Sequence, residues 1–305
     1  MNCYAAWNPS CEDRRGSASG GIASMLASQI IKEGGVYFGT RWGEDMRACV
    51  AWTEKDVRPF RGSRYVQSLF SPEVRETLET FLKAGRTVFF VGTPCQVASL
   101  RKLKERYPEQ LLCADLLCHG TTGASWLADE VRYLAKGQPV SDIRFREGPV
   151  FRMSLWNGER CISSVPAERS PYLYAYLSGI SLRPACYTGP FANLKRTGDL
   201  TLGDFIGLPG NVSFVWPHTE AGDRLLHACG AVLEEHPLQE RLAYRPGILE
   251  PTHAPTLEKR FRQAIARETF PKAIRSVLRG YFIGLPFRKA WKWLHHQAHL
   301  VKSSF

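Results

Sequence analysis

Residues 87–120 read TVFFVGTPCQVASLRKLKERYPEQLLCADLLCHG. The apolar runs TVFFV and LLCADLL are typical of strands that are buried on both faces of a parallel sheet. A polar loop follows each run, GTPC after the first and CHG after the second, and helices are expected over 95–106 and 125–135. Strand, loop and helix repeated in this order predict a parallel α/β arrangement. Because ligands of open α/β sheets bind at the carboxyl ends of the strands, the two loops indicate one shared site.

The flanking sequence continues the same pattern. Residues 16–35 begin with a Gly/Ser turn and continue as an apolar-periodic helix, which Gly34 and Gly35 end. The further expected elements are strands at 36–40 and 48–52, a helix at 72–84, a β-rich hairpin at 141–160, a helix at 170–180, short strands within 199–216 and a helix at 219–234. We therefore expect an α/β fold with a mixed or mostly parallel sheet flanked by helices, and a basic helical C-terminal appendage.

The composition is that of a globular protein with a sizeable core: 305 residues, of which 44% are hydrophobic and 23% charged. We expect an α/β domain at 1–235, an irregular and helical extension at 236–270 and a tail at 271–305. No apolar run approaches the ~18 residues that span a bilayer, and the N-terminus lacks the apolar segment of a signal peptide, so a cytoplasmic location is expected. The net charge of +11 favours anionic partners.

The cysteine content excludes two common kinds of site. The chain has nine cysteines, an odd number that argues against a disulfide framework. No two of them have the CxxC spacing, which excludes a zinc ribbon and a ferredoxin motif.

The segment SASGG opens the first predicted helix. Exposed N–H groups and the dipole at a helix start favour phosphate, and glycine allows close approach of a ligand. The candidates for cofactor binding in this segment are Ser17, Ser19, Gly20 and Gly21. Ser and Gly also begin helices simply as caps, and that alternative stays open.

A second candidate segment is Gly62-Ser63-Arg64-Tyr65, which places a cation and an aromatic ring beside a flexible turn. Arginine suits a pyrophosphate and tyrosine suits stacking on a flavin or nucleotide ring. The alternative is a polar turn that leads into an edge strand.

The two loops of the central segment carry residues suited to redox or proton chemistry: Thr93, Cys95 and Gln96 in one, Cys118 and His119 in the other. A thiol at a helix N-terminus has a lowered pKa, and a histidine beside a thiol can carry protons. Inert buried cysteines and a structural histidine are the alternatives.

The segment GDLTLGDF contains two acidic residues, Asp199 and Asp204. Both are candidates for bonding to a ribose or to ring nitrogens. An aspartate in a glycine-flanked turn is more often a turn former.

Six motifs occur in a fixed order: SASGG, GSRYVQS, VGTPCQVASL, DLLCHG, LRPACY and GDLTLGDFIG. The series extends over roughly residues 1–230 and resembles the coenzyme F420 hydrogenase/dehydrogenase beta-subunit family. That family includes bacterial members encoded with capsule and exopolysaccharide genes. The resemblance implies a non-Rossmann α/β domain that binds FAD, with the SASGG glycines at phosphate and Gly62 to Tyr65 at the cofactor.

The same resemblance places Cys95, Cys118 and Cys186 at family cysteine positions, which hold a 4Fe–4S cluster in redox members. This chain lacks the CxxCxxCxxxCP segment of many members, and Gly189 replaces the second cysteine of CYxCPF. The family motif GDFWG also loses its tryptophan, because Ile206 stands there. A cluster of this type takes four thiolates. We therefore expect FAD but no intact iron–sulfur cluster and no other metal.

Three functions fit these motifs. The first is an FAD-dependent oxidoreductase that acts in surface polysaccharide biosynthesis. The second is a non-redox transferase or modifying enzyme of exopolysaccharide assembly, which would reuse the fold for a sugar nucleotide or a lipid-linked glycan. The third is a non-catalytic accessory subunit.

The tail at 271–305 has seven Lys or Arg and no acidic residue, interleaved with apolar and aromatic residues. Pro286 divides it into two short segments. It is expected either to pack on its own domain or to anchor the protein at an anionic membrane surface. Nucleic acid is not expected as a partner, because no nucleic-acid motif accompanies the charge.

Overall fold

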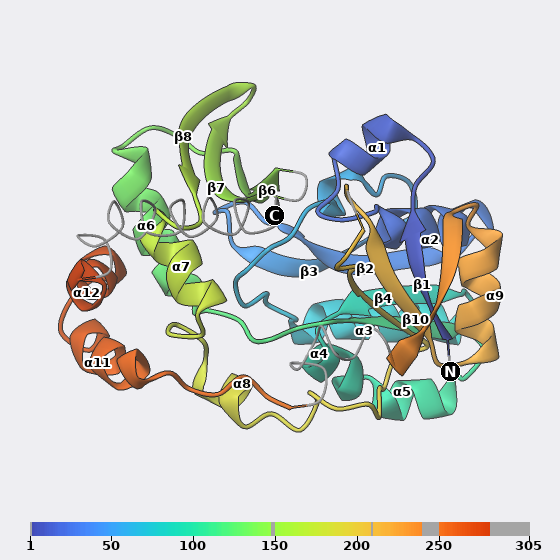
Figure 1. The fold of residues 1–305 in the computed structure, drawn as a ribbon. Coiled ribbons are helices and arrows are strands. Elements are labelled where there is room, and N and C mark those ends of the chain that lie inside the picture. The colour runs from blue at the N-terminus through green and yellow to red at the C-terminus, as the bar shows by residue number, and fades with distance from the viewer. Residues whose placement is uncertain (1, 148–149, 209, 240–249, 281–305) are drawn as a thin grey trace, which may run out of the picture.

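The structure is a computed structural model that describes residues 2–147, 150–208, 210–239 and 250–280. Two sheets organise it: a large mixed sheet with helices on both faces, and a small antiparallel sheet beside one end of it (Figure 1). The predicted α/β fold with a mixed, mostly parallel sheet is confirmed.

The large sheet has eight strands in the order β11-β1-β10-β9-β5-β4-β2-β3. Its four parallel strands are β2 (Val36–Trp42), β4 (Val88–Gly92), β5 (Leu111–Leu116) and β9 (Leu200–Asp204). The strands with antiparallel pairings are β3 (Ala48–Thr53) on one side and β10 (Ser213–Pro217), β1 (Asn2–Trp7) and β11 (Val232–Pro237) on the other. The carboxyl ends of β4, β5 and β9 therefore meet at one edge of the sheet.

Alternation along the strands divides the core between the two faces. Phe89 packs with α2 (Ile22–Lys32) and α9 (Glu220–Ala228). Phe90, the next residue of β4, packs on the opposite face. The helices on that face are α3 (Pro72–Lys83), α4 (Pro94–Ser99) and α5 (Arg101–Arg106). Successive side chains of a strand point to opposite faces, so a continuous apolar run is buried on both sides.

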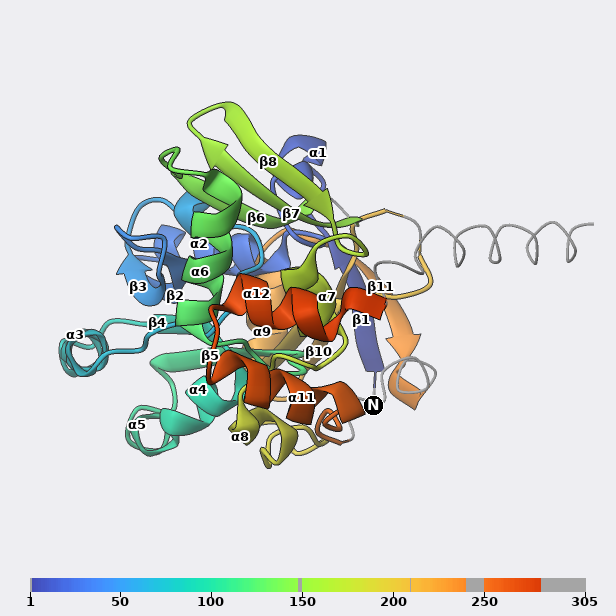
Figure 2. The same ribbon diagram turned by 90° about the vertical axis from the view of Figure 1, so that its left-hand side faces the viewer.

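The small sheet consists of β6 (Asp142–Glu147), β7 (Val150–Asn157) and β8 (Arg160–Pro166), with antiparallel pairing. The hairpin predicted at Asn157-Gly158 joins β7 to β8, and Gly158 has the positive φ of 56° that this tight turn favours. Four helices surround the sheet: α6 (Ala124–Ala135), α7 (Pro171–Leu177), α11 (Thr256–Ile265) and α12 (Phe270–Val277), as Figure 2 shows. Their aromatic core includes Phe145, Tyr172, Phe261 and Phe270.

Three expectations differ from the structure. The helix expected at 95–106 is divided into α4 and α5 at Leu100. The helix expected at 219–234 ends at Ala228, and Gly230, with a φ of 74°, precedes strand β11. Strand β1 was not expected, because its only partners, β10 and β11, lie more than 200 residues away in the sequence.

The first residues of the predicted tail are part of the core. Helix α12 packs against α6 and α7, with Ile274 fully buried. Arg275 also forms two contacts of 2.9 Å with the buried carboxylate of Glu130 on α6. Residues 281–305 lie outside the described part of the chain, and the division into segments at 235 and 270 stays a prediction. Within the described residues, no helix combines the length and apolar character needed to cross a membrane.

Candidate functional site

A cleft of about 290 Å³ lies at the carboxyl ends of β4, β5 and β9. Eleven of the fourteen residues expected at the site line it: Ser17, Ser19, Gly21, Gly62, Ser63, Arg64, Tyr65, Thr93, Gln96, Cys118 and Asp204. They come from segments that are far apart in sequence. The shared site expected from the two strand-end loops is therefore present as a single cleft.

Gly20 does not line the cleft but brings its wall together. A Cβ at this position would lie 2.2 Å from the carbonyl oxygen of Ala6 on β1. The N–H of Gly20 donates to Ser213 Oγ on β10 over 2.9 Å. Only glycine allows this close approach of two backbone segments.

The first turn of α2 faces the cleft, which Ile22, Ala23 and Ser24 help to line. The residue before the helix is Gly21, with a φ of 86°, and no side chain caps the helix there. The N–H groups of the first turn of a helix have no partner within the helix, and the helix dipole adds positive potential. This wall of the cleft therefore suits an anionic group such as a phosphate.

Arg64 lines the cleft, but its terminal nitrogens are engaged by its own loop. Its Nη1 donates to the carbonyl oxygens of Phe60, Arg61 and Gly62 over 2.9–3.1 Å, and Nη2 donates to that of Pro59 over 2.8 Å. Burial lowers the pKa of Arg64 to about 10. The guanidinium thus holds the loop in shape, and its expected role at phosphate stays a prediction.

Arg61 was not expected at the site. It also lines the cleft, and its Nη2 forms an ion pair of 2.6 Å with Asp13 in α1 (Cys11–Arg15). Within the described residues its Nε is buried and has no partner. Arg61 therefore has donors to offer a ligand that Arg64 lacks.

Both faces of the Tyr65 ring are covered. Tyr176 stacks on one at a centroid distance of 4.7 Å, and Phe151 stacks at 5.9 Å. Two hydroxyl groups, from Thr122 and Tyr172, donate to the Tyr65 carbonyl oxygen over 3.3 and 2.9 Å. The expected role of Tyr65 as a stacking platform for a cofactor ring would require this stack to open.

Gln96 joins two walls of the cleft. Its Oε1 accepts from the backbone N–H of Thr93 over 3.0 Å, and its Nε2 donates to Ser68 Oγ over 2.9 Å. The side chain caps α4 and also fixes the segment that follows Tyr65.

Three cysteines lie near one another at this end of the sheet. Cys118 lines the cleft, and burial raises the pKa of its thiol to about 12, with smaller contributions from Cys186 and Cys95. Cys95 is exposed, with its Sγ 3.1 Å from Thr93 Oγ1, and is not among the lining residues. In the described ranges, no three His, Cys, Asp or Glu side chains are arranged to hold a metal ion. The expectation of no iron–sulfur cluster stays a prediction.

His119 and Asp204 have different surroundings. His119 is not among the lining residues; its Nε2 lies 3.2 Å from the carbonyl oxygen of Tyr176, and the two rings are in contact. Asp204 ends β9, lines the cleft and pairs with Arg146 of the small sheet over 2.6 Å. Their catalytic roles stay predictions.

Asp199 lies away from the cleft. Its carboxylate accepts from Lys104 Nζ at 3.0 Å, from the N–H of Cys113 and from Thr219 Oγ1, so it ties the beginnings of β5 and β9 together. The alternative of a structural aspartate describes its surroundings.

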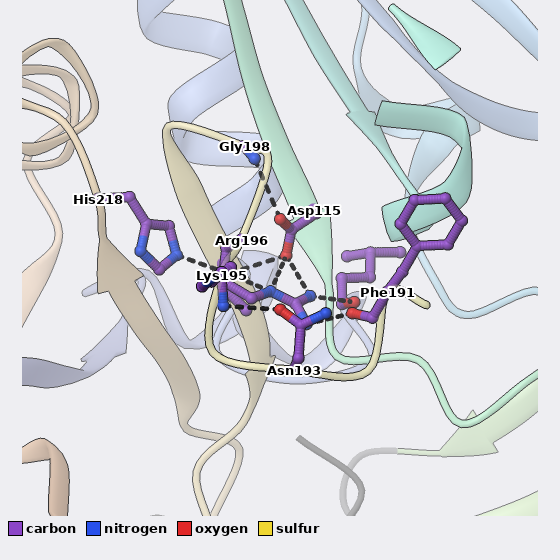
Figure 3. A network of polar contacts seen from close by, with 9 residues as sticks. Asp115, Phe191, Asn193, Lys195, Arg196, Gly198 and His218 are labelled. Atoms are coloured by element: carbon purple, nitrogen blue, oxygen red, sulfur yellow. Dashed lines mark hydrogen bonds and ion pairs between the residues drawn. The ribbon is translucent and has the colours of Figure 1, made fainter. Parts of the chain in front are cut away.

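A second buried carboxylate lies closer to the cleft. Asp115, near the end of β5, pairs with Arg196 and accepts from Thr201 Oγ1 over 2.8 Å (Figure 3). Arg196 also donates to the carbonyl oxygen of Phe191 over 3.2 Å. The network therefore fixes the loop after Cys186 against the strand that leads to Cys118.

Fold and cleft together define an α/β protein whose ligand site lies at the carboxyl ends of its parallel strands. Residues 85–241, more than half of the chain, match the family of the coenzyme F420 hydrogenase/dehydrogenase beta subunit, over the C-terminal part that defines it. The chain belongs to this family, and the resemblance found in its motifs is confirmed.

Among solved structures, a chain of the F420-reducing NiFe hydrogenase complex from Methanosarcina barkeri is similar to this one. The TM-score is 0.56 and the sequence identity 19%, over 92% of this chain and 90% of that chain. The likeness extends the shared oxidoreductase fold beyond the matched residues to nearly the whole chain. A search of curated protein sequences gives no match.

Proposed function

We propose that this chain is a flavin-dependent oxidoreductase that binds FAD in the cleft at the strand ends. One observation carries the proposal: residues of the segments beginning at Ser17, Gly62, Thr93 and Cys118 line a single cleft. Such a position is where open α/β sheets bind nucleotides. Membership of a redox family agrees with this assignment.

The walls of the cleft fit the polar parts of FAD. The first turn of α2, with Ser17 and Ser19 before it, would hold a phosphate through uncapped N–H groups. Arg61 would add a charge-assisted hydrogen bond to the same anion. The bound flavin would supply hydride and electron transfer, while the chain binds it, orients it and excludes water.

The described residues do not fit an iron–sulfur cluster in the same way. Three family cysteine positions are present, and Gly189 cannot ligate iron. No step of the proposed function therefore passes through a cluster.

We also propose that the reaction belongs to surface polysaccharide biosynthesis, which rests on the resemblance to the polysaccharide-associated members of the family. The second substrate would then be a sugar nucleotide or a lipid-linked glycan. If the protein binds a sugar nucleotide and no flavin, the transferase alternative replaces the oxidoreductase.

The site is tested by adding one negative charge to the proposed phosphate wall. Ser24 lies in the first turn of α2 and lines the cleft, whereas Ser28 lies one turn further along and is exposed. Ser24→Asp should leave the helix as stable as before or more so, because a carboxylate near a helix N-terminus is favourable. The same charge should repel a phosphate at this position.

FAD affinity is measured by fluorescence titration of the wild type, Ser24→Asp and the control Ser28→Asp. We expect at least a tenfold loss for Ser24→Asp, about 1.4 kcal/mol, and little change for the control. Equal affinity of all three proteins would contradict the phosphate assignment. A wild type that binds neither FAD nor FMN would contradict the flavin proposal itself.

A further inference from the structure

Arg146 joins the two sheets beside the cleft. It lies on β6 of the small sheet, and its Nη1 donates to Oδ2 of Asp204, the last residue of β9 in the large sheet, over 2.6 Å. The Arg146 side chain is only 8% exposed, and that of Asp204 is 33% exposed. A largely buried ion pair therefore connects the small sheet to a residue that lines the cleft.

The strand itself changes course to direct this side chain. Arg144 and Arg146 are two residues apart, so in a regular strand they would lie on the same face. The pairing of β6 with β7 shifts register between them. Arg144 remains exposed, whereas Arg146 reaches Asp204. Irregularities of this kind re-aim side chains and are frequent beside functional sites.

Arg146 also holds Tyr65. It donates a hydrogen bond to the Tyr65 hydroxyl, and its guanidinium lies 4.7 Å above the ring of Phe151, which covers one face of Tyr65. Burial acts to lower the pKa of Arg146, but Asp204 and Tyr65 outweigh it, and the pKa is raised. The residue is therefore a cation in its buried position.

This arrangement is costly for stability. Among the described residues, Arg146 Nε is buried and has no hydrogen-bond partner. A buried donor without a partner costs about 1–3 kcal/mol, and a buried ion pair is often no more stable than apolar side chains of similar volume. Such costs are typical of functional sites rather than of stabilising contacts.

We propose that Arg146 is the positioning residue of the cleft. By fixing the Asp204 carboxylate and the Tyr65 ring, it sets where the site accepts hydrogen bonds from a flavin nucleotide, whose ring N–H and ribityl hydroxyl groups are donors. The proposal rests on the flavin site proposed above and adds the residue that controls the fit of the ligand. Asp204 touches the ligand, and Arg146 acts through it.

The chain offers a matched control on the same strand. Arg144 also forms an ion pair, at 2.7 Å to Asp142, and also lies over an aromatic ring, 4.4 Å from that of Trp156. It makes neither of the contacts that Arg146 makes to cleft residues. Arg144→Met therefore removes the same chemical groups from the small sheet without altering the cleft.

The first experiment uses no ligand. Amide hydrogen exchange is measured at residues 62–68 and 200–204 in the wild type, Arg146→Met, Arg146→Lys and Arg144→Met. We expect faster exchange in both segments for Arg146→Met, partial restoration for Arg146→Lys and wild-type rates for Arg144→Met. Wild-type rates in Arg146→Met would overturn the proposal, whether or not the protein binds flavin.

The second experiment measures FAD affinity in the same variants and in Asp204→Asn, alone and combined with Arg146→Met. We expect a 10- to 100-fold loss for Arg146→Met, a smaller loss for Arg146→Lys and none for Arg144→Met. The double variant should bind no more weakly than Asp204→Asn alone, because Arg146 acts through Asp204.

Two outcomes of the affinity measurement would overturn the proposal: unchanged affinity in Arg146→Met, or losses that add fully in the double variant. Thermal unfolding of each variant separates these outcomes from misfolding. If the wild type binds no flavin, the proposed function fails, and the exchange experiment alone decides whether Arg146 organises the cleft.

Discussion

Arg196 and Asp115 form a buried ion pair, with Arg196 Nε 3.0 Å from Asp115 Oδ1 and side chains that are 3% and 0% exposed. Thr201 Oγ1 and the N–H of Gly198 also donate to this carboxylate. The pair connects β5 to the loop that leads into β9, directly behind the strand ends that form the cleft (Figure 3).

Breaking this pair should destabilise the protein strongly. Replacing Arg196 by Met leaves the buried carboxylate without its cation, and such a loss costs about 3–5 kcal/mol. Urea unfolding at neutral pH measures the change. The control is Arg224→Met, which removes an exposed pair with Glu220 and should have no measurable effect. A similar effect of both substitutions would show that the Asp115 network does not stabilise the strand ends.

His218 should make stability depend on pH. Burial lowers its pKa from 6.5 to about 4, while its Nε2 remains 2.8 Å from Thr201 Oγ1. Because the folded-state pKa lies below the unfolded one, the unfolded chain binds the proton more readily between these values. Stability is therefore lost as the pH falls from about 6.5 towards 4, by roughly 2 kcal/mol at pH 5.

The measurement is the free energy of unfolding in urea at pH 7.5, 6 and 5, for the wild type and His218→Asn. Other groups near the imidazole, Asp115, Arg196 and Asp199, are common to both proteins. We expect the difference between the two proteins to change over this range. A difference independent of pH would mean that His218 does not titrate as its burial implies.

Arg61 and Arg64 should separate ligand binding from loop stability. Arg64→Met removes the donor to four backbone carbonyl groups, so it should lower the melting temperature as well as FAD affinity. Arg61→Met removes a partly exposed ion pair and should cost little stability, but about 1–3 kcal/mol of FAD affinity if it bonds the phosphate. Calorimetry and FAD titration of both variants provide the comparison, and the reverse pattern would assign the phosphate to Arg64.

Residues 281–305 are proposed to bind an anionic membrane surface. They contain Arg288, Lys289, Lys292 and Lys302 and no acidic residue, and each cation contributes about 1 kcal/mol near such a surface. Helix α12 packs in the core, so the truncated chain should end at Gly280. The full chain should sediment with phosphatidylglycerol vesicles and lose binding at high salt, and the truncated chain should not. Equal, salt-insensitive sedimentation would exclude the anchor.

The sequence predicted the centre of the fold because the information there is local. The apolar runs before Gly92 and Cys118 identify buried parallel strands, and each ends in a loop that leads to a helix. Strand β1 was missed because it pairs only with strands more than 200 residues away. The helix expected to continue to 234 was wrong because Gly230 ends it and the next residues pair with β1.

The site was predicted as far as motifs extend. Gly20 was expected at phosphate, but its close contact with Ala6 comes from a strand that the sequence did not reveal. Arg61 and Arg146 were missed because neither belongs to a recognised motif. Only the register shift in β6 brings Arg146 to Asp204, and no local pattern in DIRFRE indicates it.

The central claim is that the cleft holds a flavin, and the most direct test is the small molecule that the purified full chain carries. The account predicts a yellow protein with absorbance near about 450 nm, which on denaturation releases about one FAD per chain, identified by its mass. A colourless protein that takes up no flavin when incubated with FAD, and binds a sugar nucleotide instead, would contradict it.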